Sequence, residues 1–171
     1  GHNDDNVKFW AQMDYLIPNL YRILKPGRIA AIHVKDRIQY ATITGNGCYT
    51  ILPFSDECVA AFLKHGFKYM SRIQIDTDVV RENNQTYRLG HTEKCKDASK
   101  MGAGLPEYLL IFRKPQTDLS RGYADEPVQK SKDDFTLGKW QLLASSAWRS
   151  DGNTLLSPQE YLEMAPDKVF K

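Results

Sequence analysis

The sequence predicts an α/β domain, and three stretches carry this prediction. Apolar residues recur with helical spacings of three and four over residues 10–24. The run 29–34 is apolar on both faces, as expected of a strand that helices cover on both sides of a largely parallel sheet. From Phe67 to Ile75 the hydrophobic period changes to two, which indicates a strand with one wetter face. With a second helix predicted between the two strands, this order is typical of α/β folds.

The first helix is expected to begin in the polar cluster at residues 3–6 and to end at Lys25-Pro26-Gly27. Proline cannot continue a helix, and glycine tolerates the turn that reverses the chain. Pro18 lies inside the helical pattern. Because proline removes a backbone donor and its ring collides with the preceding turn, we expect it to kink or divide this helix.

The second helix is expected to follow an irregular connection over residues 38–54, where Gly45-Asn46-Gly47 and Pro53 interrupt any regular period. Ser55 is the predicted N-cap of this helix, because its hydroxyl can accept a hydrogen bond from an amide of the first turn. Gly66 is expected to end the helix.

The strand after this helix is expected to alternate strictly between two faces. One predicted face holds Phe67, Tyr69, Ile73 and Ile75, and the other holds Lys68, Arg72 and Gln74. Residues 77–106 then show no clear period, and their length predicts a functional excursion or a mobile segment. Leu109 to Phe112 predict a third strand.

The last part of the chain, residues 116–171, is predicted to be a separate tail that follows the α/β unit at residues 1–115. We expect an extended tail whose Trp140 and Trp148 pack onto that unit, since tryptophans flanked by leucine and alanine are more often packing anchors than base-stacking rings. A capping box at residues 157–160 predicts a short C-terminal helix.

The charge balance excludes a strongly basic nucleic-acid binder. The 171 residues include 23 Lys and Arg and 21 Asp and Glu, for a formal net charge of +2 at pH 7. This excess is too small to attract a polyanion over the whole surface, so any nucleic-acid surface must be local. No run approaches the roughly 18 apolar residues of a membrane span, and we expect no membrane partner.

The cysteines and histidines predict neither a disulfide framework nor a metal site. Cys48, Cys58 and Cys95 are odd in number and far apart, and no C-x-x-C pair occurs. The four histidines share no metal-ligand spacing. A reducing, cytoplasmic compartment fits this pattern best.

Two motifs carry a resemblance to a known family. Residues 20–28, LYRILKPGR, lead into residues 32–36, IHVKD, and this passage resembles the helix-to-strand transition in the second half of S-adenosylmethionine-dependent methyltransferases. Residues 96–102, KDASKMG, and 106–114, PEYLLIFRK, resemble the phage and prophage-type DNA methylases that modify an exocyclic amino group of adenine or cytosine. Residues 147–149, AWR, extend the similarity.

This resemblance spans most of residues 9–156 and implies a partial Rossmann-like methyltransferase sheet of mixed type. The three strands would be the fifth, sixth and seventh of that sheet, with the last antiparallel and inserted between its neighbours. The resemblance also implies S-adenosylmethionine as methyl donor, DNA as partner, a bacterial cytoplasm, and a role in restriction-modification or phage biology. Because an open sheet edge favours association, we expect the tail or a second copy in a homodimer to cover the truncated edge.

Two working parts of the resembling family are missing from this sequence. The catalytic tetrad is Asp, Asn or Ser followed by two prolines and an aromatic residue, yet no Pro-Pro pair occurs. The tetrad polarises the target amine while its ring stacks on the extruded base. The glycine-rich cofactor turn is also missing, because Gly102-Ala103-Gly104 precedes a strand instead of following one. We therefore predict no catalytic residue here, and a methylase fragment that neither binds S-adenosylmethionine tightly nor methylates DNA alone.

The competing interpretation is a non-catalytic DNA-binding or interaction module on a methyltransferase-like scaffold. The reading frame that encodes the chain discriminates between the two interpretations. An upstream tetrad and a downstream glycine-rich turn would favour the enzyme, whereas a stop codon just after Lys171 would favour the module.

The target-pocket candidates are His33, Lys35 and Asp36, at the carboxyl end of the first predicted strand. Open α/β sheets place their ligands at this end. The alternative is a hydrogen-bonded histidine at a strand end, beside a solvated Lys-Asp pair.

The DNA-binding candidates lie in residues 77–106, which mix groups that hold phosphates with groups that read base edges. They are Arg81, Asn83, Arg88, His91, Lys94, Lys96 and Lys100. Four acidic residues in the same stretch leave its charge only slightly positive, so a solvated loop stays open as the alternative.

Overall fold

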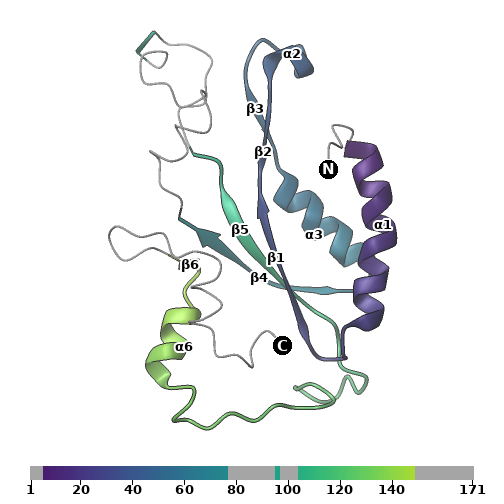
Figure 1. Cartoon of the computed structure of the whole chain (residues 1–171), viewed down its shortest axis with the longest axis vertical. Helices are drawn as coiled ribbons and strands as arrows, with labels where there is room; N and C mark the ends of the chain where they lie inside the picture. The colour runs from purple at the N-terminus through teal and green to yellow at the C-terminus, as the bar shows by residue number, and fades with distance from the viewer. Residues whose placement is uncertain (1–5, 77–94, 97–103, 149–171) are drawn as a thin grey trace.

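A mixed four-stranded sheet forms the centre of the chain (Figure 1). The computed structural model describes residues 6–76, 95–96 and 104–148. The strands of this sheet are β1 (Ile29–Lys35), β4 (Lys68–Ile75), β5 (Glu107–Arg113) and β6 (Ala147–Trp148). Their order across the sheet is β1-β5-β4-β6.

The strand directions confirm the predicted arrangement of the first three strands. β5 lies between β1 and β4 and runs antiparallel to both, with Leu110 opposite Ile32 on one side and Arg72 on the other. β1 and β4 therefore run in the same direction, and the last of the three strands is inserted in reverse. β6 pairs with β4 in parallel, so the tail contributes a strand at that edge.

Two helices, α1 (Asn6–Ile23) and α3 (Phe54–Lys64), cover one face of the sheet. Both lie on the same side of β1 in Figure 1. The core between them includes Ile17 of α1, at 1% exposed, and Phe62 of α3, whose ring stacks on Phe112 with centroids 4.5 Å apart. Burial of these apolar side chains is the main stabilising term.

The other face of β1 is more open than the sequence pattern predicted. Val34 lies in the core, but Ala31 and His33 on the opposite face are exposed. The prediction of a strand covered on both faces is therefore wrong for the described part of the chain. The physical reason is that α1 and α3 share one face, so alternate residues of β1 lie away from them.

α1 runs through Pro18 without interruption, so of the two predicted outcomes, a kink or a division, the division does not occur and the kink stays a prediction. A proline inside a helix costs about 3 kcal/mol. The neighbouring Ile17 is fully buried against α3 and the sheet, and this packing offsets the local cost.

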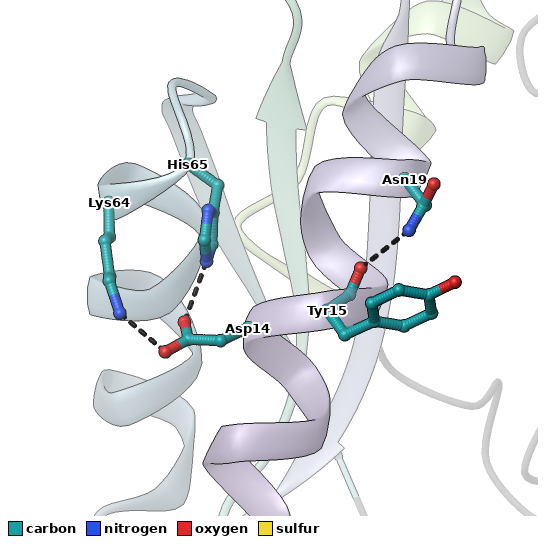
Figure 2. A network of polar contacts seen from close by, with 5 residues as sticks. All are labelled: Asp14, Tyr15, Asn19, Lys64 and His65. Atoms are coloured by element: carbon teal, nitrogen blue, oxygen red, sulfur yellow. Dashed lines mark hydrogen bonds and ion pairs between the residues drawn. The ribbon is translucent and has the colours of Figure 1, made fainter.

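Polar contacts also join the two helices (Figure 2). The carboxylate of Asp14 on α1 accepts a hydrogen bond from Lys64 Nζ at 2.6 Å and lies 2.8 Å from His65 Nε2. These hydrogen bonds hold the pKa of Asp14 below its ordinary value. The network lies on the exposed side of the helix pair.

β4 contains a bulge that changes which side chains share a face. Tyr69 pairs with Phe112, and the next pair is Ser71 with Ile111, so Met70 is the extra residue. One extra residue reverses the alternation beyond it. The predicted common face of Phe67, Tyr69, Ile73 and Ile75 is therefore wrong, because the bulge separates its first two members from its last two.

The predicted irregular connection is also wrong, because it forms a β-ribbon. β2 (Arg37–Gln39) and β3 (Thr50–Leu52) pair antiparallel, and the short helix α2 (Ala41–Thr44) lies between them. Gly45 and Gly47 adopt φ of 74° and 72°, a left-handed conformation that allows the reversal. We call residues 37–52 the β2–β3 arm. In Figure 1 the arm extends past α3 at the carboxyl end of β1.

The tail is less extended than predicted. Its helix α6 (Leu137–Leu143) is capped by Thr136, whose hydroxyl accepts a hydrogen bond from the backbone amide of Lys139 in the first turn. Trp148 in β6 is less exposed than Trp140, which is 50% exposed, so Trp140 is covered less than the prediction of a packing anchor implies. The predicted helix from residue 157 lies outside the described residues. None of the described helices is both long and apolar enough to cross a membrane.

Candidate nucleic-acid interface

A charged cluster forms at the carboxyl end of β1. His33 and Lys35 alternate with the buried Val34, so they lie on the face away from α1 and α3. Glu107 begins β5 and lies directly opposite Lys35. Its carboxylate is 3.0 Å from Lys35 Nζ and 3.5 Å from His33 Nε2. The structure thus brings two of the three target-pocket candidates together around a carboxylate that the sequence interpretation missed.

The cluster carries little net charge. The carboxylate of Glu107 balances the ammonium of Lys35 at 3.0 Å. The side chain of His33 is 50% exposed, against 29% for Lys35 and 18% for Glu107. Of the three, His33 is therefore the most accessible to a ligand.

Asp36 makes a different contact from its neighbours His33 and Lys35. It is 8% exposed, and its Oδ1 accepts a hydrogen bond from the backbone amide of Ser55 at 2.8 Å. This bond satisfies an amide in the first turn of α3, where Pro53 offers no side-chain acceptor. The prediction that Ser55 is the N-cap is therefore wrong, because the helix begins at Phe54 and a residue distant in sequence satisfies the turn.

Arg37 follows Asp36 and lies over an aromatic surface. Its Cζ is 4.0 Å from the centroid of the Phe54 ring and 5.3 Å from that of Phe9. Cation–π contacts of this kind fix the plane of a guanidinium. The residue is exposed, and sequence reasoning missed it, although a cation directly after a strand end was a signal that could have been used.

Nearly all the DNA-binding candidates of the long excursion lie outside the described residues. Lys96 is described and exposed. The others, outside the described ranges, are Arg81, Asn83, Arg88, His91, Lys94 and Lys100. Their role stays a prediction.

The buried thiol of Cys58 is unsuited to chemistry. Burial raises its pKa to about 12, so the reactive thiolate is scarce at neutral pH. Within residues 6–76, 95–96 and 104–148, no group of three or more His, Cys, Asp or Glu side chains could hold a metal ion.

The two carboxylates at the carboxyl end of β1 are a poor fit for the methyl donor that the resemblance implies. A nucleoside needs free acceptors for its ribose hydroxyls, such as the carboxylate that dinucleotide-binding folds provide. At the carboxyl end of β1, Asp36 is buried on an amide and Glu107 is paired with Lys35 and His33. Both carboxylates are already engaged.

The fold is similar to that of a Thermus thermophilus protein assigned as a DNA modification methylase. Its complex with S-adenosyl-L-methionine matches with a TM-score of 0.67 and 19% identity, over 99% of this chain and 61% of that one. The chain has a methyltransferase-like fold. This result confirms the predicted fold class, including the mixed sheet.

Two further structures of the same protein agree. The selenomethionine derivative matches with a TM-score of 0.65 over 99% of this chain and 62% of that one, and a third structure matches with 0.59 over 88% and 52%, both at 19% identity. The chain therefore spans about three fifths of the length of the first two. It matches no family model and no curated protein sequence.

Proposed function

We propose that this chain is part of a DNA methyltransferase and supplies its scaffold and part of the wall that faces the target base. In the whole enzyme, S-adenosylmethionine would be the methyl donor and an exocyclic amino group of adenine or cytosine the acceptor. The observation that carries the proposal is the β1-β5-β4 strand arrangement within a fold similar to the T. thermophilus protein over 99% of the chain. One structure of that protein contains S-adenosyl-L-methionine, which supports the choice of donor.

In this proposal, His33 and Lys35 contact the target strand at the carboxyl end of β1, and Glu107 orients both. Asp36 positions α3 beside them. The excursion at residues 77–106 adds phosphate and base contacts. No group in this set activates an amine, so the chain alone is not expected to methylate DNA.

DNA binding by the chain tests this role. A fluorescently labelled duplex titrated with protein at several salt concentrations gives the affinity and its salt slope. The double variant Lys94→Ala/Lys96→Ala should bind more weakly, and its slope should fall by about two because two phosphate contacts are removed. A matched control is Lys130→Ala/Lys132→Ala in the tail. An unchanged slope in the first variant would count against the loop contacts, and a wild-type chain that binds no duplex at low salt would contradict the DNA role.

A second candidate, the non-catalytic module, is favoured by one observation: the two carboxylates at the end of β1, Asp36 and Glu107, already have protein partners. The encoding reading frame separates the candidates, as the missing tetrad and glycine-rich turn must flank this segment in an enzyme.

We also propose a homodimer that forms through the open edge of β1. β1 lies at one end of the described sheet, and an unpaired strand edge can pair with a second copy. Sedimentation equilibrium of the chain should then show a dimer, and a monomer at all concentrations would contradict it.

A further inference from the structure

The β2–β3 arm is free of negative charge. Residues 37–52 contain no Asp or Glu, and their one formally charged side chain is Arg37 at the root of the arm. The rest of the chain is mixed in sign, with 21 acidic residues in 171. A projecting segment without carboxylates does not repel a polyanion, so its charge is compatible with nucleic acid.

The carboxylates near Arg37 hydrogen-bond to other groups, so they do not occupy its guanidinium. Asp36, next in sequence, accepts from the Ser55 amide, and Glu57 of α3 accepts from Trp10 Nε1 at 2.9 Å. In the described part of the chain, the guanidinium of Arg37 lies over the rings of Phe9 and Phe54. A guanidinium held over aromatic rings keeps its N–H donors for a ligand, and its planar fork suits phosphate oxygens.

The aromatic surface below Arg37 is itself fixed. The Trp10 and Phe54 rings stack with centroids 5.5 Å apart, and Phe9 lies against Phe54 at 5.4 Å. The hydrogen bond from Trp10 to Glu57 ties this surface to α3. A cation held in this way loses little conformational entropy when it binds an anion.

The far end of the arm is exposed. Ile43 on α2 is 75% exposed and Tyr40 is 48% exposed, and the neighbouring Asn46 is also exposed. A two-stranded ribbon is narrow enough to enter the major groove of duplex DNA, where an Asn side chain and an apolar side chain can both contact base edges. Figure 1 shows that the arm projects from the carboxyl end of β1, the strand whose last three residues include His33 and Lys35.

We propose that the β2–β3 arm is a second DNA-binding element, in which Arg37 binds a backbone phosphate and the end around Ile43 and Asn46 enters a groove of the duplex. The inference rests on the proposed function and deepens it, since it assigns a contact separate from residues 77–106. The ligand is duplex DNA, recognised by phosphate charge at the root and by groove shape at the end.

The test compares three variants in the duplex titration. Arg37→Gln should weaken binding about threefold or more near 100 mM salt and lower the salt slope by about one. Arg37→Lys should keep the slope, because the charge stays, but lose part of the affinity with the planar stack. Ile43→Asp places a carboxylate at the exposed end and should weaken binding about threefold or more without changing the urea midpoint of unfolding, since the position is far from the core.

The matched control is Lys132→Gln, an exposed cation of the tail, which should change neither affinity nor slope. If Arg37→Gln and Ile43→Asp both bind like the wild type, the inference is overturned while the proposed function stands. If the wild-type chain binds no duplex, both are overturned. If Arg37→Gln also lowers the urea midpoint, Ile43→Asp decides: wild-type affinity in that variant overturns the inference, and weakened binding supports it.

Discussion

Replacing Asp36 with alanine should destabilise the contact between β1 and the start of α3. Asp36 is 8% exposed. Its carboxylate accepts a hydrogen bond from the backbone amide of Ser55, a residue that is 1% exposed. Without the carboxylate, that amide loses its partner in a place that water does not reach. Leaving a buried donor unsatisfied costs about 1–3 kcal/mol, and losing a helix cap costs about 1 kcal/mol. Both costs arise from the same hydrogen bond and are not added, so the free energy of unfolding should fall by about 2 kcal/mol.

The assay is urea unfolding followed by circular dichroism at pH 7, with thermal unfolding beside it. For a chain of this size, about 2 kcal/mol corresponds to a fall in Tm of roughly 4–8 °C. Asp36→Asn keeps an acceptor oxygen and should cost about 1 kcal/mol. The control Asp133→Ala removes an exposed carboxylate and should stay within about 0.5 kcal/mol of the wild type. If Asp36→Ala unfolds at the same urea concentration as this control, the capping role is refuted.

Two further predictions concern titratable groups. The pKa of Asp14 is lowered by hydrogen bonds from Lys64 and His65, so its stabilisation is present above the ordinary carboxyl pKa, about 4, and is lost as pH falls through the lowered value. The difference in urea midpoint between wild type and Asp14→Asn should therefore be largest near neutral pH and shrink in acid, and a difference that stays constant would contradict this. The pKa of Cys58 is about 12, so a thiol-specific reagent at pH 8 should modify the exposed Cys95 first and reach Cys58 only after unfolding. Peptide mass spectrometry measures both rates, and equal rates in the folded chain would show that the thiol is not shielded.

The order of the main elements could be predicted from the sequence because hydrophobic periodicity reports local structure directly. The helical spacing of α1 and the apolar run of β1 are local signals, and the structure contains both elements. The direction of β5 between β1 and β4 came instead from the family resemblance, since periodicity does not encode strand order. The bulge at Met70 could not be read, because one extra residue leaves composition unchanged while it reverses the alternation of β4.

The candidate site was predicted only in part for a similar reason. His33 and Lys35 were found because a strand end is visible in the sequence. Their partner Glu107 lies 72 residues or more away and meets them only through the register of β5, which no local pattern specifies. Asp36 stands beside Lys35 in the sequence, yet the buried amide of Ser55 determines its role, and burial of that kind follows from tertiary packing.

Methyl transfer from radiolabelled S-adenosylmethionine to mixed-sequence duplex DNA tests the central claim most directly, with this chain and the product of its full reading frame assayed in parallel. The account predicts label on the exocyclic amino groups of one base with the full product and none with the chain alone. Transfer by residues 1–171 by themselves, or a full product that binds DNA and leaves it unlabelled, would contradict it.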